Sequence, residues 1–317
     1  MPPNQRSIEA LEKLSQLHAV PIENLDPVEA RKEERRTTLP FLTPPEPVDR
    51  IENRIIPDRL NQIPVRIYWP KITEDEDVQD LSPITLFFHG GGWVLGSLDL
   101  YDELCCMLSN RSESIVVSVD YRLAPEHRFP AAIHDCYDAT KWVAENASDL
   151  EGDEDTIVVA GESAGGTLAI DTCLLARDRG GPQLALSVPI YPVTDLARDL
   201  SKYAGDKFGP SKEAMDWFIS HYIESDSELR DPLASPQYAD LRGLPTTMMI
   251  TAEFDPLREQ ELDFAERMKE SGVKFDLRDY PGLVHGFVSL PGYYPEGRQA
   301  IEAIASEIKR IYVENEA

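Results

Sequence analysis

The sequence lacks any run of about 18 apolar residues, the length that a membrane-spanning helix needs. Its first residues, 1–7 (MPPNQRS), also lack the apolar core of a secretory signal. Cysteine is scarce, and none of Cys105, Cys106, Cys136 and Cys173 forms a pair with the spacing of metal ligands. These absences favour a reduced, cytoplasmic protein with no membrane span and no metal site.

Positive charge is in short supply as well. Lysine and arginine number 31 against 57 aspartates and glutamates, which gives a net charge of −26. This charge argues against nucleic acid and anionic membranes as partners, because both would be repelled. Lysine is rarer still, with 10 residues against 21 arginines. Such a surface fits either a salty cytoplasm that screens self-repulsion or an ordinary acidic protein, and both explanations stay open.

What the chain does have is a regular alternation of strands and helices, within 317 residues of which 42% are hydrophobic. Strands are expected at 48–56, 63–69, 83–88, 114–119, 156–161, 184–190, 246–252 and 274–280. Helices are expected at 99–111, 130–147, 164–179, 257–271 and 296–313. Alternation of this kind, with apolar β-branched strands, predicts an α/β fold with a mostly parallel sheet covered by helices on both faces.

Three segments depart from this alternation. Residues 7–36 predict two short helices, the first of them amphipathic. Residues 73–80 are an acidic loop. Residues 195–235 interrupt the rhythm with a helix at about 211–224, which indicates an insertion over the top of the sheet.

Gly161-Glu162-Ser163-Ala164-Gly165 fits the pattern G-x-S-x-G and lies where the strand 156–161 meets the helix 164–179. A sharp strand-to-helix turn exposes a serine hydroxyl, and glycines on both sides leave room for it. The start of the following helix directs unpaired N–H groups and a positive dipole end at the same place. Ser163 is therefore the candidate nucleophile.

A second motif, His89-Gly90-Gly91-Gly92, directly follows the strand 83–88. Consecutive glycines after a strand allow the backbone to approach a ligand with free N–H groups. In acyl transfer such donors stabilise the negative charge on the carbonyl oxygen. We expect the N–H groups of Gly91, Gly92 and Ala164 to form an oxyanion hole, although a glycine-rich turn without function is the alternative.

The activating base is expected among six histidines. His285 follows the last predicted strand, and the carboxyl ends of parallel strands meet at one edge of a sheet, where Ser163 also lies. His89 opens the glycine loop and is expected to hold it by hydrogen bonding. The other four, which occur in predicted helices or in a rigid proline-containing loop, favour structural or surface roles: His18, His127, His134 and His221.

The histidine needs a carboxylate that holds its tautomer. Asp255 directly follows the strand 246–252 and precedes His285 by 30 residues. The order Ser, Asp, His is that of α/β-hydrolases. Glu253 is the competing carboxylate, and the position of Asp255 at the strand end, before Pro256, favours Asp255.

The segments that carry these features resemble the hormone-sensitive lipase family of α/β-hydrolase carboxylesterases. They are His89–Trp93, Tyr121–Ala132, Gly161–Gly166, Asp255–Leu257 and His285–Phe287. The resemblance implies one domain over residues 1–317, with an eight-stranded sheet and a helical cap formed by about 1–47 and 195–235. It implies the roles given above and hydrolysis of short- to medium-chain esters without a cofactor. Glu162 stands where the family commonly has aspartate, which can alter contacts beneath the turn.

Substrate contacts are less well defined. Trp93, beside the glycine loop, is a candidate pocket wall, and four residues of the predicted helix 211–224 are candidate lid residues, with core packing as the alternative: Met215, Trp217, Phe218 and Tyr222. Within Tyr121–Ala132, Tyr121, Arg122 and Glu126 could form a polar network that supports the glycine loop, although a rigid structural loop is favoured.

Two other functions stay open beside ester hydrolysis, and so does the oligomeric state. The same constellation fits an amide or formamide hydrolase. A non-catalytic relative that uses the pocket for binding is disfavoured, since such proteins tend to lose the histidine. The strand 274–280 is expected at a sheet edge, which is compatible with a homodimer or with a monomer.

Overall fold

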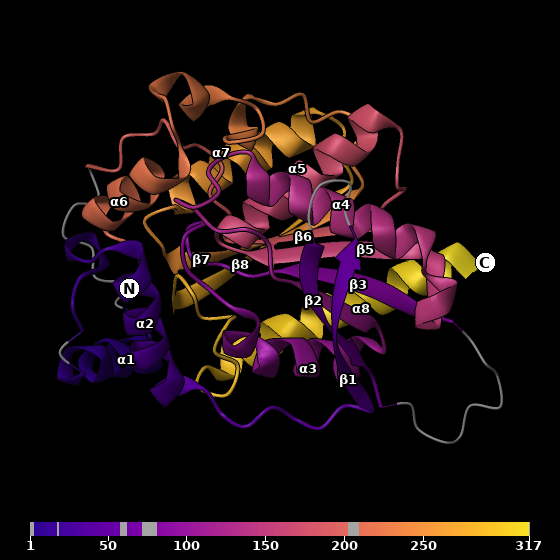
Figure 1. The fold of residues 1–317 in the computed structure, drawn as a ribbon, viewed down its shortest axis with the longest axis horizontal. Coiled ribbons are helices and arrows are strands. Elements are labelled where there is room, and N and C mark those ends of the chain that lie inside the picture. Colours follow the sequence, from indigo (N-terminus) through magenta and orange to yellow (C-terminus); the bar gives the residue numbers. More distant parts are fainter. Residues whose placement is uncertain (1–2, 18, 58–61, 72–80, 202–208, 317) are drawn as a thin grey trace.

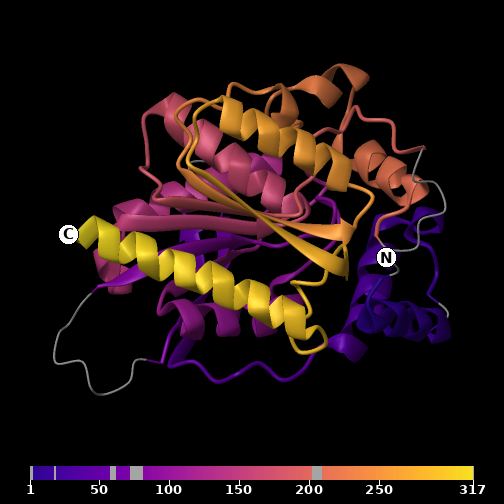
Figure 2. The ribbon, with the colours of Figure 1, turned by 180° about the vertical axis from the view of Figure 1, so that it is seen from behind.

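The computed structural model describes residues 3–17, 19–57, 62–71, 81–201 and 209–316. His18 and the acidic segment 73–80 lie outside the described residues, so their predicted structures stay predictions. Figure 1 shows a central sheet with helices above and below it, and Figure 2 shows the same layers from behind.

The sheet has eight strands in the order β1-β2-β4-β3-β5-β6-β7-β8. In chain order they are β1 Arg50–Pro57, β2 Gln62–Trp69, β3 Ser82–Phe88, β4 Ile115–Val119, β5 Gly152–Glu162, β6 Leu186–Ile190, β7 Thr246–Phe254 and β8 Phe275–Val284. β2 runs antiparallel to both β1 and β4, whereas the six strands from β4 to β8 run parallel. The predicted mostly parallel, eight-stranded sheet is confirmed.

Helices cover both faces of the sheet, as predicted. In chain order they are α1 Gln5–Gln16, α2 Pro27–Thr38, α3 Asp102–Ser112, α4 Ala131–Glu145, α5 Ala164–Arg179, α6 Lys212–Tyr222, α7 Arg258–Glu270 and α8 Pro295–Glu316. α4, α5 and α7 lie on one face, and α3 and α8 lie together on the other (Figures 1 and 2). No helix in the described part of the chain combines the length and the apolar character needed to cross a bilayer.

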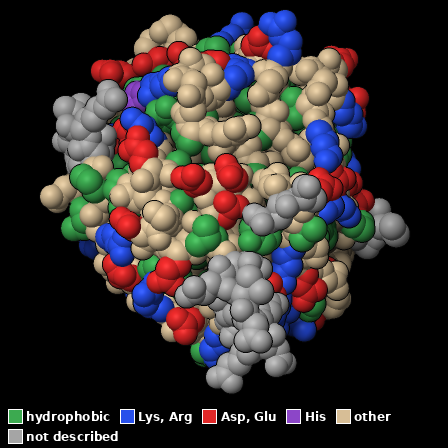
Figure 3. Space-filling model, turned by 90° about the vertical axis from the view of Figure 1, so that its right-hand side faces the viewer, with side chains coloured by type: hydrophobic (Ala, Val, Ile, Leu, Met, Phe, Trp, Pro, Cys, Tyr) green, Lys and Arg blue, Asp and Glu red, His purple; other side chains and the backbone are tan. Residues whose placement is uncertain are grey.

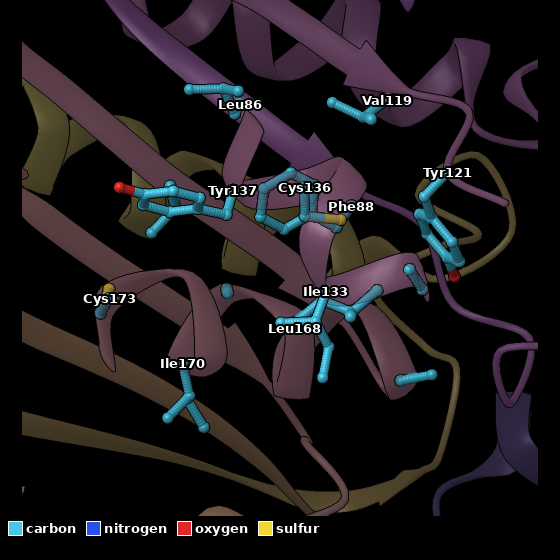
Figure 4. Close-up of a cluster of buried hydrophobic side chains, with 14 of the residues drawn as sticks. Leu86, Phe88, Val119, Tyr121, Ile133, Cys136, Tyr137, Leu168, Ile170 and Cys173 are labelled. Carbon is cyan, nitrogen blue, oxygen red and sulfur yellow. The ribbon is translucent and has the colours of Figure 1, made fainter. Parts of the chain in front are cut away.

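The core between the sheet and the α4–α5 layer is closely filled. Figure 4 shows Leu86 and Phe88 of β3 near Ile133 and Cys136 of α4 and Leu168 of α5. Each of these five side chains is fully buried. Burial of large apolar side chains stabilises by about 1.5–3 kcal/mol each, so this layer fixes the position of β3 and β5, whose ends carry the two glycine motifs.

Two strands, β5 and β8, extend four residues beyond the ends that the sequence predicts. β5 begins at Gly152, because Ser82 pairs with Gly152 before a register shift into the main ladder. β8 continues past Pro281 to Val284, because a register shift after Ala252 lets Phe254 pair with Val284. The second extension matters most, since it places residue 285 directly at a strand end.

α1, α2 and α6 gather at one end of the sheet (Figure 1, left). The start of α1 is tied to β8: Asn4 donates its N–H to the Gly282 carbonyl at 2.8 Å. The Ser7 hydroxyl donates to the same carbonyl at 3.2 Å. The start of α1 is therefore attached to β8 at Gly282, three residues before His285.

Acidic and basic side chains are interspersed on the surface. Figure 3 shows Asp and Glu side chains across one face with Lys and Arg between many of them. β8 forms one edge of the sheet, and the side chains of Arg278 and Asp276 on it are about half exposed. A homodimer through this strand stays a prediction.

Candidate active site

Ser163 lies in a tight turn between β5 and α5. Its φ of 54° is in the left-handed region that side chains rarely adopt. Its N–H donates to the Ile190 carbonyl at 2.9 Å, which ties the turn to β6. A Cβ on Gly165 would lie 1.9 Å from the Phe88 carbonyl oxygen, and one on Gly161 would lie 2.1 Å from that of Gly165. Both glycines are therefore needed for the turn to form.

The structure brings Ser163, His285 and Asp255 together. His285 Nε2 is 3.0 Å from Ser163 Oγ, and His285 Nδ1 is 2.6 Å from Asp255 Oδ2. Asp255 is further fixed by Leu257, whose N–H donates to Asp255 Oδ1 at 2.8 Å. A hydroxyl, an imidazole and a carboxylate in this sequence of contacts are arranged to move a proton from the serine to the histidine.

Glu253, the competing carboxylate, has a different partner. Its Oε2 accepts the N–H of Gly282 at 2.7 Å. At the end of β7, Asp255 therefore bonds to the imidazole of His285, whereas Glu253 bonds to the backbone of β8.

The charge of Asp255 governs the ionisation of His285. Burial by itself lowers the pKa of His285, but the carboxylate and hydrogen bond of Asp255, with the nearby Glu162, raise it above its ordinary value of 6.5. The imidazolium is therefore stabilised, as a base that accepts a proton beside a carboxylate requires.

This shift predicts the pH dependence of turnover. Only a neutral imidazole can accept a proton from Ser163, and a raised pKa keeps His285 protonated to a higher pH. We expect the acid limb of kcat/KM to have its midpoint above 6.5, the ordinary histidine value. Initial rates on one soluble ester across the pH range measure it, and a midpoint at or below that value would contradict the role of Asp255.

The glycine loop faces Ser163 with free donors. Gly91 and Gly92 have φ of 110° and 58°. In the described part of the chain, no acceptor is bonded to the N–H of either residue. Ala164 is the first residue of α5, where helical N–H groups have no partner within the helix. The three predicted oxyanion donors therefore lie on the two turns that frame the serine.

His89 holds the start of this loop. Its Nδ1 is 2.7 Å from the Gly90 carbonyl oxygen, and Tyr121 donates its hydroxyl to the His89 carbonyl at 2.8 Å. Burial lowers the pKa of His89 to about 4, so its ring is neutral and its Nδ1–H donates. Of the polar network considered around Tyr121, Arg122 instead pairs with Asp135 of α4, and Glu126 pairs with Arg31 of α2.

Glu162 lies beneath the serine turn. Its Oε2 accepts the Tyr101 hydroxyl at 2.6 Å, and the same hydroxyl accepts the Gly90 N–H at 3.0 Å. Removal from water raises the pKa of Glu162. A carboxylate at this position therefore links the serine turn to the glycine loop through Tyr101, a connection that the sequence did not indicate.

A cavity of about 420 Å³ opens beside Ser163, His285, Gly91 and Gly92. Three of the predicted substrate residues line it, namely Trp93, Met215 and Phe218.

The prediction is wrong for the other two residues, Trp217 and Tyr222. Neither is among the described residues that line the cavity. The Trp217 indole donates to the Leu25 carbonyl at 3.1 Å. Tyr222 is buried with its ring stacked on Trp93, 4.4 Å between centroids. Core packing, the stated alternative, holds both side chains away from the cavity.

Much of the cavity wall was not predicted. It comes from α1, from α2 and the turn after it, from the turn before α3 and from the segment after β8: Ala10, Leu11, Leu14, Glu34, Thr37, Phe41, Leu100, Leu290 and Tyr294. For α1 a signal existed, since its apolar spacing predicts a buried face. For Glu34 there was none, because it stands within a run of charged residues, 31–36, that is typical of an exposed helix.

Known proteins are similar to this chain over most of its length. A family model for the alpha/beta hydrolase fold matches residues 85–289. Carboxylesterase NlhH of Mycobacterium tuberculosis is 40% identical over 277 residues, covering 84% of this chain and 85% of that protein. An arylesterase of Saccharolobus solfataricus is 38% identical over 274 residues, covering 85% of this chain and 86% of that protein.

Solved structures extend the likeness to the whole fold. A hyperthermophilic esterase from the archaeon Pyrobaculum calidifontis has a TM-score of 0.89 and 38% identity, over 99% of this chain and 100% of that one. An ester hydrolase from the metagenome of Lake Arreo, complexed with a bipyridine phosphonate derivative, has a TM-score of 0.90 and 32% identity over 98% of this chain and 99% of that one. The chain therefore belongs to the hormone-sensitive lipase family of carboxylesterases with the alpha/beta hydrolase fold.

Proposed function

We propose that this chain hydrolyses carboxylic esters through an acyl-enzyme on Ser163, with His285 as base and Asp255 as the carboxylate that orients it. One observation carries the proposal: His285 Nε2 lies 3.0 Å from Ser163 Oγ while its Nδ1 lies 2.6 Å from Asp255 Oδ2. A neutral imidazole bonded in this way accepts the serine proton as the hydroxyl attacks.

In the first half of the reaction, Ser163 Oγ attacks the ester carbonyl carbon and its proton passes to His285 Nε2. The carbonyl oxygen becomes an oxyanion, for which the N–H groups of Gly91, Gly92 and Ala164 are the proposed donors. Loss of one such donor costs about 3 kcal/mol of transition-state stabilisation in related chemistry. His285 then protonates the departing alcohol oxygen, and the acyl group remains on Ser163.

In the second half, a water molecule replaces the alcohol. His285 takes a proton from the water as it attacks the acyl carbon, and the same oxyanion donors act again. Collapse of this intermediate returns the proton from His285 to Ser163 and releases the carboxylic acid. Neither half requires a metal ion or a cofactor.

We further propose that about 1–47 and 195–235 form a cap over this site. The support is the gathering of α1, α2 and α6 at one end of the sheet (Figure 1). The cavity beneath them, about 420 Å³ and mostly apolar in its walls, has the size of a site for one small molecule. This size favours short and medium acyl chains over long ones.

A panel of p-nitrophenyl esters from acetate to palmitate tests the proposal. Each buried methylene contributes about 0.8 kcal/mol, so kcat/KM is expected to rise until the acyl chain fills the cavity. We expect the highest value between butyrate and octanoate, and a value at least about tenfold lower for palmitate.

Two results would count against this proposal. A maximum at palmitate would contradict the substrate class, and no turnover of any ester would contradict the reaction. Matched p-nitroanilides, measured beside the esters, separate ester from amide hydrolysis. The cytoplasmic location and the homodimer stay predictions beside this activity.

A further inference from the structure

Two residues of α2, one helical turn apart, contact the segment 93–96, which continues the glycine loop from Gly92. Arg31 Nε donates to the Val94 carbonyl at 2.8 Å. Glu34 Oε2 accepts the Gly96 N–H at 2.8 Å. α2 donates one of these hydrogen bonds and accepts the other. Because the two loop residues are two positions apart, the pair holds the loop backbone at two points.

Arg31 extends the same contact to the neighbouring loop. Its Nη2 donates to the Ala124 carbonyl at 2.8 Å, and Ala124 donates its N–H to the Trp93 carbonyl at 2.9 Å. Glu126 holds the guanidinium in place through a 2.7 Å ion pair. α2 therefore holds the Val94 carbonyl directly, through Arg31, and the Trp93 carbonyl indirectly, through Ala124.

This part of the loop needs outside support. Gly91, Gly92, Trp93 and Gly96 all have positive φ, and glycine gives up more conformational freedom on ordering than any other residue. Within the loop, the Leu95 N–H bonds to the Gly91 carbonyl at 2.8 Å. A movement of Val94 or Gly96 is therefore passed to Gly91, whose N–H is a proposed oxyanion donor.

We propose that Arg31 and Glu34 are positioning residues of the oxyanion hole, which place the Gly91 and Gly92 donors by holding Val94 and Gly96. The inference rests on the ester hydrolysis proposed above, and it gives α2 a role in catalysis beyond forming the cavity wall. We call the contacts of Arg31 and Glu34 with Val94 and Gly96 the clamp. A donor displaced by about 1 Å loses much of its effect on the transition state, so loss of the clamp is expected to lower kcat.

The charge of Glu34 strengthens its bond to the loop. Removal from water raises the pKa of Glu34 to about 7. The groups that face it are Glu162 and Arg31, which act in opposite directions on its charge, and the phenols of Tyr101 and Tyr121. Below this pKa the neutral acid is a weaker acceptor for the Gly96 N–H than the carboxylate.

Three variants test the clamp. Glu34→Leu removes the acceptor and keeps an apolar wall, and we expect kcat on p-nitrophenyl butyrate to fall about tenfold with KM nearly unchanged. Glu34→Gln keeps an amide oxygen for the Gly96 N–H and should restore most of kcat. Lys32→Gln, an exposed change on the same helix, is the matched control and should match the parent.

Arg31→Met adds a second, independent measurement. It removes the donors to Val94 and Ala124, and we expect a loss in kcat of similar size. Residues that act as one unit are not additive. The double variant Arg31→Met, Glu34→Leu should therefore lose clearly less than the product of the two single losses.

The outcomes separate this inference from the function itself. An inactive parent enzyme would remove the proposed function. An active parent with kcat unchanged in Glu34→Leu, or with only KM raised and only for bulky esters, would remove the clamp and leave Glu34 as a wall of the cavity.

A pH profile decides the case even if the leucine variant does not fold. Protonation of His285 stops turnover, whereas protonation of Glu34 only weakens its bond to the Gly96 N–H. The acid limb of kcat in the parent should therefore carry a partial step beside the main one. Glu34→Gln, whose neutral oxygen accepts the Gly96 N–H equally at every pH, should lack the partial step, and an unchanged limb would overturn the inference. Circular dichroism and thermal melting of each variant identify any that are unfolded.

Discussion

Ser163→Ala is expected to lower kcat for every ester by at least about 10⁴-fold while leaving the fold unchanged. Alanine keeps the Cβ, so the turn with φ of 54° carries the same backbone strain and keeps its bond to Ile190. Only the hydroxyl that bonds to His285 Nε2 is lost. Initial rates with p-nitrophenyl butyrate, together with thermal melting, measure both parts.

Labelling with a phosphonate provides the control for this variant. The parent should gain one phosphonyl group on the peptide that contains residue 163, and the variant should gain none. Ser220→Ala removes an exposed hydroxyl that bonds within α6 and should keep both activity and labelling. Substantial ester turnover by Ser163→Ala would show that another group is the nucleophile.

Asp255→Asn is the second change with a large expected effect, about 10⁴-fold in kcat. The asparagine amide can present N–H groups to His285 Nδ1, which favours the tautomer with its proton on Nε2. That nitrogen then cannot accept the Ser163 proton. The charge that raises the pKa of His285 is also lost, so the acid limb of the remaining activity should move to lower pH.

Glu253→Gln is the matched variant, because the two carboxylates are two residues apart at the end of β7. The glutamine oxygen can still accept the Gly282 N–H that Glu253 accepts at 2.7 Å. We expect kcat within about threefold of the parent, as for a change that keeps its hydrogen bond. If Glu253→Gln is the more damaging of the two, the assignment of Asp255 is wrong.

The chemistry of the site was readable from the sequence because it depends on strand ends. Ser163, Asp255 and His285 each directly follow a strand of a parallel sheet, and the carboxyl ends of such strands meet at one edge. The glycines at 161 and 165 were readable for a related reason, since a Cβ at either would strike a backbone oxygen. These features follow from local backbone geometry, which a single sequence encodes.

The surroundings of the site were less readable because they depend on packing between distant segments. Trp217 and Tyr222 have the spacing of lid residues, but whether they face the cavity or the core is decided by Leu25 and Trp93, on other elements. Glu34 was missed because its partner, Gly96, is 62 residues away and its own helix has the charge pattern of an exposed one. The periodicity of a helix predicts which of its faces is apolar, but it does not predict which other segments that face contacts.

The tie between α1 and β8 has a consequence for the order in which this protein becomes active during synthesis. Ser7 bonds to a carbonyl 275 residues later in the chain, so α1 cannot make this contact until β8 has been synthesised. Asp255 and His285 also emerge late. No nascent fragment can therefore assemble the complete site, and a ribosome that stalls before β8 would release an inert protein.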